Sequence, residues 1–201
     1  AMVTILCGEL GITPERIIYQ DVDTSSITDS APTVASRGTL VGGNAVIDAA
    51  NQIKNLMEPV LVRLIGNTRS KYNFVGDRIV NPTTKKEINF TDAVLECHKQ
   101  RIYLYALGVW RGPKVGWDDE HGQGDAYFTY VYGCNAVEIN IDAASGKVQV
   151  LKAVGAHDVG RAINPQMLKG QILGGMVMGM GQCLSEEIIH KEGRIQNLNF
   201  N

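Results

Sequence analysis

Residues 32–39, PTVASRGT, are small, hydroxylated or basic, and they stand directly before a predicted helix. Short side chains let backbone N–H groups and hydroxyls come close to an anionic or polar ligand, and Arg37 adds a charged hydrogen-bond donor. The run could therefore bind an anionic group of a cofactor or substrate. Taken alone, it fits a plain loop-to-helix junction better, with a Ser or Thr capping the helix.

A second candidate lies at residues 157–165, HDVGRAINP, where a predicted strand ends and a helix begins. The following helix contains five glycines within twelve residues, at Gly170, Gly174, Gly175, Gly179 and Gly181. Each glycine costs about 1 kcal/mol relative to alanine inside a helix. Close approach of a bulky cofactor or of another helix backbone would offset that cost, and the sequence leaves both explanations open.

Other polar clusters are better explained without a ligand. His157-Asp158 could suggest a metal pair or a general base, but such a dipeptide more often makes a turn hydrogen bond. The cluster 118–121, DDEH, offers oxygen and nitrogen ligands but lacks the EF-hand spacing, which favours a solvated loop. The aromatic residues of 127–132 favour sheet packing. We find no Rossmann or P-loop glycine pattern.

Composition and charge exclude several classes of protein. The 201 residues are 44% hydrophobic and 20% charged with a formal net charge of −2, which indicates a folded protein and disfavours nucleic acid as a partner. The four cysteines, Cys7, Cys97, Cys134 and Cys183, form no CxxC pair, so we expect free thiols in a reducing cytoplasm. No secretory signal begins the chain, and the weakly polar run 172–180 is far too short to span a membrane.

Apolar periodicity predicts four helices, over residues 2–10, 41–65, 91–100 and 165–189. Pro59 predicts a kink or a break in the second helix, Thr91 is the expected N-cap of the third, and Asn164-Pro165 opens the fourth.

Strands are predicted over residues 16–20, 101–110, 127–142, 148–154 and 194–200, with two short ones between 78 and 90. The turn 143–147 joins two of them into a hairpin, and a surface loop is expected over 111–125. This mixed order predicts an α+β fold with mixed sheets and long packing helices.

Four runs, taken in order, are similar to the molybdenum hydroxylase family of xanthine dehydrogenase, aldehyde oxidase and bacterial relatives. They are ITPERI, APTVASRGTLVGGNAVIDAA, YVYGCNAVEINIDAASGKVQVLKAVGAHDVGRAINP and LKGQILGGMVMGMGQCLSEE. The resemblance covers nearly the whole chain and implies the second half of the family's molybdopterin-binding large subunit. Residues 1–201 are thus expected to be a partial molybdopterin-binding domain, the C-terminal half, truncated before the segment with the catalytic glutamate.

The resemblance also implies which residues contact the cofactor. Those expected to bind it are Ala35, Ser36, Arg37, Gly38 and Gln171. It implies no metal ligand and no catalytic residue in this chain, because the family's glutamate base lies in a Gly-Glu motif that would follow Asn201 and other cofactor loops would precede Ala1. Neither Glu186 nor Glu187 matches that base.

The implied function is a fragment or split subunit of a molybdenum-dependent hydroxylase acting on a heterocycle or aldehyde. The implied cofactor is molybdenum-molybdopterin, in the cytosine dinucleotide form if the protein is bacterial. Iron–sulfur clusters and FAD would lie on partner subunits or domains, together with the remaining part of the molybdopterin subunit. The isolated chain is expected to be inactive and to self-associate. The alternatives are a non-catalytic assembly or scaffold domain that keeps the fold, and an unrelated α+β protein that binds small molecules.

Overall fold

The computed structural model describes residues 1–20, 23–25, 29–34 and 37–198, so Ala35 and Ser36 lie outside the described residues. The chain divides into two compact units, Ala1–Lys114 and Val115–Asn201. Helices and small antiparallel sheets occur in both, which confirms the predicted α+β class. Each unit is described by itself.

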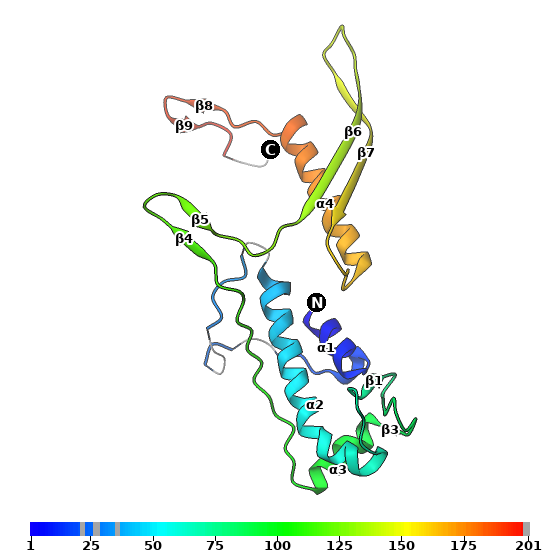
Figure 1. Ribbon diagram of the computed structural model, residues 1–201. Helices are drawn as coiled ribbons and strands as arrows, with labels where there is room; N and C mark the ends of the chain where they lie inside the picture. Colours follow the sequence, from blue (N-terminus) through cyan, green and yellow to red (C-terminus); the bar gives the residue numbers. More distant parts are fainter. Residues whose placement is uncertain (21–22, 26–28, 35–36, 199–201) are drawn as a thin grey trace. The chain divides into compact units, whose positions relative to one another are not determined.

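The first unit is built around one long helix (Figure 1). Its helical elements are α1 (Met2–Leu10), the 3-10 turn η1 (Pro14–Arg16), the π-helical turn η2 (Gly38–Gly42), α2 (Gly43–Ile65) and α3 (Phe90–Lys99). Its strands are β1 (Asn73–Val75), β2 (Arg78–Val80) and β3 (Glu87–Asn89), which form one antiparallel sheet in that order.

Glycines allow α1 to pack against the beginning of α2. A Cβ added at Gly42 would lie 2.7 Å from Met2 Cε, and one at Gly43 would lie 2.9 Å from Ile5 Cδ1. Helix α1 then ends at Gly11, whose φ of 63° suits glycine and whose backbone would leave a Cβ 2.3 Å from the Phe74 backbone. The helix predicted over residues 2–10 is therefore confirmed.

The core of the chain lies in the first unit. Its buried apolar residues are Leu10, Ala50, Met57, Val60, Leu61, Ile65, Ile79, Phe90, Ala93 and Cys97. The row Phe74, Ile79 and Ile88 crosses the three strands and packs on this cluster. Burial also raises the pKa of the Cys97 thiol.

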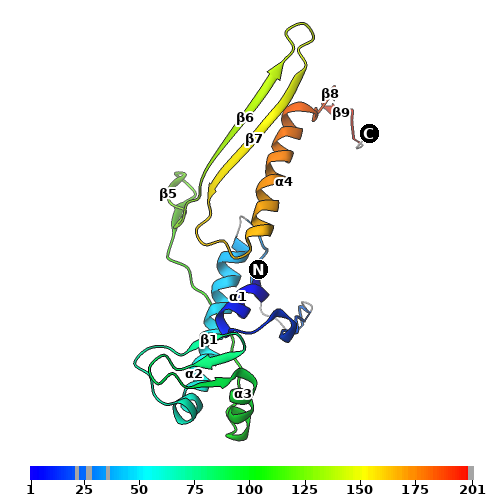
Figure 2. The ribbon, with the colours of Figure 1, turned by 90° about the vertical axis from the view of Figure 1, so that its right-hand side faces the viewer.

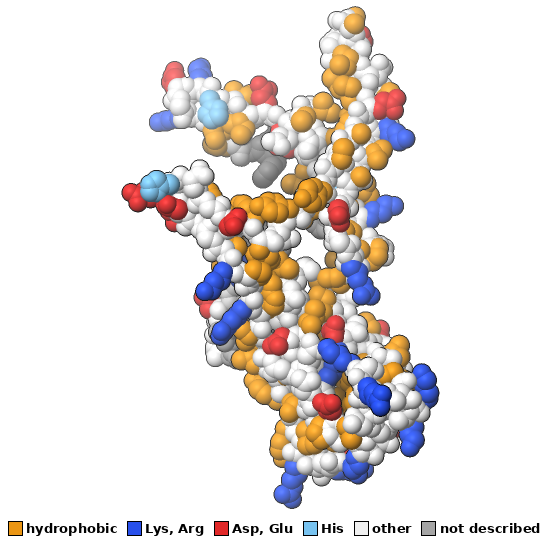
Figure 3. All heavy atoms as spheres, viewed as in Figure 1, with side chains coloured by type: hydrophobic (Ala, Val, Ile, Leu, Met, Phe, Trp, Pro, Cys, Tyr) orange, Lys and Arg blue, Asp and Glu red, His pale blue; other side chains and the backbone are white. Residues whose placement is uncertain are grey.

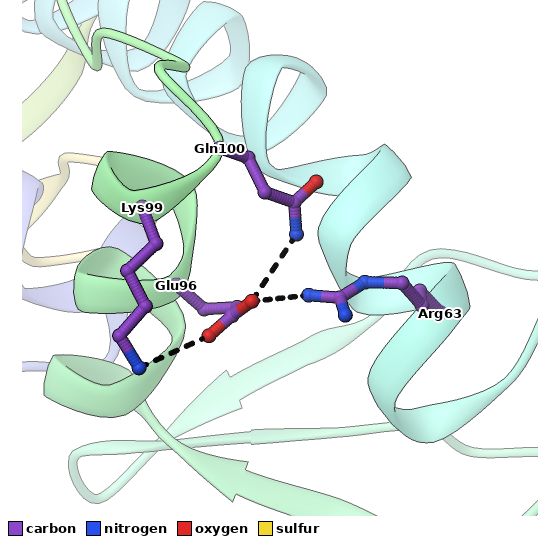
Figure 4. A network of polar contacts seen from close by, with 4 residues as sticks. All are labelled: Arg63, Glu96, Lys99 and Gln100. Carbon is purple, nitrogen blue, oxygen red and sulfur yellow. Dashed lines mark hydrogen bonds and ion pairs between the residues drawn. The ribbon is translucent and has the colours of Figure 1, made fainter.

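A polar network joins α2 to α3 at the edge of this core (Figure 4). Glu96 accepts hydrogen bonds from Arg63 and Gln100 and pairs with Lys99 at 3.4 Å. The Arg63 guanidinium first, and then the Gln100 amide, lower the pKa of the Glu96 carboxyl.

The second unit contains a long hairpin, a long helix and two small hairpins. Its strands are β4 (Gly116–Asp118), β5 (Gln123–Asp125), β6 (Tyr132–Ile141), β7 (Val148–Asp158), β8 (His190–Lys191) and β9 (Arg194–Ile195). Strand β4 pairs with β5, β6 with β7, and β8 with β9. Helix α4 (Pro165–Leu184) lies along β6 and β7 (Figure 2). The predicted hairpin and the Asn164-Pro165 helix start are both confirmed.

None of the described residues of the second unit is buried. Strand β6 is exposed along its whole length, and large apolar side chains such as Tyr132, Val177 and Met178 are 74%, 61% and 75% exposed. Hydrophobic side chains are visible over both units in Figure 3. Exposed apolar surface can mark an association site, and self-association stays a prediction.

Several predicted helix boundaries were wrong. Helix α2 does not break at Pro59, because buried Met57, Val60 and Leu61 fix the turns on both sides of it. The N-cap of α3 is Asn89, whose side chain accepts from the Thr91 N–H at 2.9 Å, so Thr91 lies inside the helix. Helix α4 ends at Leu184 because the Ser185 hydroxyl donates to the Gly181 carbonyl at 2.9 Å.

Several predicted strands and one predicted loop were wrong. Residues 17–20 have no regular structure, and 102–110 are extended but belong to no ladder of the described residues. The expected loop 111–125 contains the β4–β5 hairpin. Among the described residues of the last predicted strand, only Arg194 and Ile195 are paired. No helix within the described residues is long and apolar enough to cross a membrane.

Candidate cofactor-binding site

Arg37 and Gly38 stand where the small-residue loop enters the helices of the first unit. Arg37 precedes η2, its N–H donates to the Val34 carbonyl at 3.2 Å, and its guanidinium lies 3.5 Å from the Pro32 carbonyl. Gly38 is in close contact with the loop, because a Cβ there would lie 2.9 Å from Thr33 Cγ2. The loop thus folds back on the helix start and keeps the Arg37 side chain beside it.

The polar corner of residues 158–164 positions the beginning of α4 in the second unit. Asp158 Oδ1 accepts from the Gly160 N–H at 3.0 Å, and Gly160 has a φ of 62°, which favours glycine. Asn164 Oδ1 caps the helix by accepting from the Met167 N–H at 3.0 Å. Asp158 therefore makes the turn hydrogen bond that its sequence predicts.

One row of α4 packs on the hairpin. A Cβ added at Gly155 of β7 would lie 3.3 Å from Ile172 Cγ2 and 3.2 Å from Met176 Sδ. Ile172 and Met176 are one turn apart and partly buried, as are Leu168 and Met180 in the same row. This row fixes which side of α4 faces away from the hairpin.

Gln171 lies beside that row, on a face that the described residues leave open. Gly174 and Gly175 follow it at i+3 and i+4 and Met178 at i+7, so these four residues share one face, here called the Gln171 face. All four are exposed, and a Cβ added at Gly174 or Gly175 would meet no atom within 4 Å. The two glycines are therefore not required by packing against the hairpin.

The Gln171 face is suited to a flat, polar group. The Gln171 amide makes no hydrogen bond to another described residue, so its two donors and its acceptor are available to a ligand. The adjacent bare backbone lets a bulky ring approach more closely than any larger residue would. The donor set and the open surface both fit a pterin with its phosphate.

The other polar candidates from the sequence, at residues 157–158 and 118–121, do not combine an open helix face with an exposed amide. The His157 ring lies over Gly133, where a Cβ would come within 2.7 Å of Nδ1, and it borders a shallow hollow of about 400 Å³. Asp118 accepts from the His121 N–H at 3.2 Å and pairs with His121 Nδ1 at 2.7 Å, and these contacts lower the pKa of its carboxyl. In the described part of the chain, no three His, Cys, Asp or Glu residues lie together as a metal site.

A family model described as the molybdopterin cofactor-binding domain matches residues 1–201, the full sequence. The chain belongs to this domain family of the molybdenum hydroxylases. The family model confirms the resemblance found in the ASRG loop, the DVGRAINP corner and the glycine-rich helix.

Relatives of the molybdopterin-binding domain include xanthine dehydrogenase of Oryza sativa subsp. japonica, which is 31% identical over 184 residues, or 92% of this chain. Among solved structures, an aldehyde oxidoreductase of Desulfovibrio desulfuricans matches 90% of the chain and 17% of its own, with a TM-score of 0.66 at 28% identity. CO dehydrogenase of Oligotropha carboxidovorans matches 99% of the chain and 24% of its own, with a TM-score of 0.78 at 20% identity, which shows the fold.

The chain spans only 12% of the length of the rice xanthine dehydrogenase. Its predicted cofactor contacts fall in two places: Arg37 and Gly38 adjoin each other in the first unit, and Gln171 lies in the second. That they meet at one cofactor remains a prediction.

Sequence reasoning missed the side chains that hold residues 107–109 against α2. Gln52 Nε2 donates to the Leu107 carbonyl at 3.0 Å, and Asp48 Oδ2 accepts from the Val109 N–H at 3.0 Å. The available signal was Gly108, since an isolated glycine in a strand-like run indicates close approach of another backbone.

Proposed function

We propose that this chain forms part of the wall that holds a molybdenum-molybdopterin cofactor in a xanthine-dehydrogenase-like hydroxylase acting on a heterocycle or an aldehyde. The observation that supports it is the Gln171 face. There the Gln171 amide makes no hydrogen bond to a described residue, and the helix backbone at Gly174 and Gly175 is exposed beside it. Glycines cost helix stability, so their presence where nothing in the described chain contacts them supports close approach of a group from outside this chain, and we propose that this group is the cofactor rather than another backbone.

Each proposed contact has a distinct role. The Gln171 amide donates to and accepts from polar atoms of the pterin or its phosphate, while Gly174 and Gly175 admit the ring system. Arg37 offers a charge-assisted donor to a phosphate, and Gly38 lets the loop at Thr33 pack closely beside Arg37. Ala35 and Ser36 complete this group of contacts in the proposal.

The bound cofactor would supply the oxidation chemistry, and the protein would supply orientation and electrostatics. No residue of this chain is proposed to act on the substrate. The rest of the molybdopterin subunit, and iron–sulfur and FAD partners, would complete the enzyme. In a bacterial protein the cofactor would carry a cytosine dinucleotide.

The test is the cofactor content of the tagged chain isolated from its own cells with the proteins that assemble with it. We expect molybdenum and pterin in the wild-type assembly, and at least a tenfold loss for Gly175→Leu, which fills the Gln171 face, with a smaller loss for Gln171→Ala. An equal loss for Arg37→Ala would support a shared cofactor for the two units. Released nucleotides would identify the dinucleotide form by mass.

Gln166→Ala is the matched control, because Gln166 is exposed on the same helix but five residues earlier and so on another face. It should leave the cofactor content unchanged. An assembly that forms normally without molybdenum or pterin would instead favour a scaffold domain that keeps the fold but binds no cofactor.

A further inference from the structure

Residues 102–110 of the first unit form an extended segment beside α2 (Figure 1). Burial alternates strictly along it: Ile102, Leu104 and every second residue after them are partly buried. The outward row, which we define as Tyr103, Tyr105, Leu107 and Val109, is 73%, 79%, 64% and 57% exposed. Four large apolar side chains in one exposed row are unusual for a surface that faces only water.

This segment is held firmly on its inner side. Gln52 and Asp48 bind the Leu107 carbonyl and the Val109 N–H, each at 3.0 Å. A Cβ added at Gly108 would lie 1.9 Å from the Ala45 carbonyl oxygen, so the backbone of the segment touches α2 directly. The exposed row therefore belongs to a fixed strand rather than to a loose loop.

The Ile102 N–H donates to the Cys97 carbonyl at 2.9 Å, at the start of the segment. Between Tyr103 and Val109, the hydrogen-bonded backbone groups belong to alternate residues, and they include the Tyr103 carbonyl, which accepts from the Tyr105 N–H at 3.1 Å. Within the described residues, the N–H and C=O groups of Leu104, Ala106 and Gly108 make no hydrogen bond. Unpaired groups on alternate residues are what an added β-strand would bind.

Charges at the two ends determine what kind of strand fits. Residues 102–110 carry no charged side chain, while the exposed Arg101 and Arg111 flank them. A second copy pairing antiparallel about Ala106 would place Arg101 opposite Arg111 at both ends, and parallel in-register pairing would also place arginine beside arginine. Like charges directly opposite each other destabilise strand pairs.

We propose that residues 101–111 are a docking edge for an extended apolar segment with carboxylates at its ends, supplied by another part of the enzyme assembly rather than by a second copy of this chain. Its backbone pairs with Leu104, Ala106 and Gly108, and its apolar side chains cover the outward row. Its terminal carboxylates pair with Arg101 and Arg111.

The test uses the full chain and synthetic peptides matched in length to residues 101–111, with alternating valine and threonine between two glutamates or, as a control, two lysines. We expect the glutamate peptide to bind roughly tenfold more tightly than the lysine peptide by fluorescence anisotropy. It should also slow amide hydrogen exchange at Leu104, Ala106 and Gly108.

The double variant R101E/R111E should reverse the preference between the two peptides. The control R69E/K71E makes the same change in net charge at exposed residues elsewhere in the unit and should leave the preference intact. Circular dichroism checks that both variants fold. The proposal would be overturned if neither peptide slowed exchange at these amides, if the double variant kept the original preference, or if raising the concentration of the chain alone protected them.

Discussion

The side-chain nitrogen of Asn81 lies 2.7 Å from the Gly66 carbonyl oxygen, and this contact joins the end of α2 to the turn between β2 and β3. Asn81 is fully buried and also donates to the Ile65 carbonyl at 3.1 Å. Its oxygen accepts from the Thr83 and Thr84 N–H groups at 2.8 and 3.1 Å. One side chain thus satisfies backbone groups from both segments.

Asn81→Ala should destabilise the first unit by about 3 kcal/mol, because it leaves several buried carbonyl and N–H groups without partners. Urea denaturation followed by circular dichroism measures this loss. Asn67→Ala is the control, since among the described residues the exposed Asn67 side chain accepts only from its neighbour Thr68, and we expect a change within about 0.5 kcal/mol. Equal losses for the two variants would mean that the buried hydrogen bonds of Asn81 contribute little.

Gly108→Ala should displace the extended segment from α2, because its Cβ would lie 1.9 Å from the Ala45 carbonyl oxygen. We expect a loss of about 2 kcal/mol in unfolding free energy and faster amide exchange at Val109. Gly116→Ala is the matched control, because a Cβ there meets nothing within 4 Å. Unchanged exchange at Val109 in the Gly108 variant would contradict the close approach.

Stability in acid should depend on Glu96. Its pKa in the folded chain is lowered from 4.5, mainly by the Arg63 hydrogen bond, so its contribution is complete above about pH 4.5 and is lost as the pH falls through the lowered value. Arg63→Met should return the Glu96 pKa toward 4.5, as measured by carboxyl NMR titration. Lys99→Met, which removes a weaker contributor, should leave most of the shift, and the opposite ranking would refute the assignment.

The purified chain should self-associate, because the second unit exposes apolar side chains and buries none of its described residues. Helix α4 is the expected contact surface. Its Leu173 and Val177 are 51% and 61% exposed and one turn apart. Sedimentation over a concentration series should show dimers or larger species, and L173K/V177K should weaken them. A chain that stays monomeric at all concentrations would show that the exposed apolar residues of α4 do not cause self-association.

The chain purified without partners should have no hydroxylase activity and little or no molybdenum, because no residue of it is proposed to act on substrate. Metal analysis and turnover assays with xanthine, nicotinate and aldehydes check this. Stoichiometric molybdenum with turnover would show instead that these 201 residues are sufficient.

Some of the fold could be predicted because its signals are local. The β6–β7 hairpin follows from alternating residues on either side of a short turn, and the start of α4 from Asn164 beside Pro165. Gly11 similarly marks the end of α1. The resemblance to molybdenum hydroxylases rested on the order of four runs, and the family model confirmed it.

The sequence by itself determined the β6–β7 hairpin, the start of α4, the end of α1 and the family, since each depends on a few neighbouring residues or on an ordered series of them. Only the tertiary structure decided that Asn81 binds Gly66, that Gly108 touches Ala45, and that residues 102–110 belong to no sheet of the described residues. It also decided that Gly174 and Gly175 face open space beside Gln171. These contacts join segments that are far apart in the sequence. Local propensity carries no information about which distant segments come together in the fold.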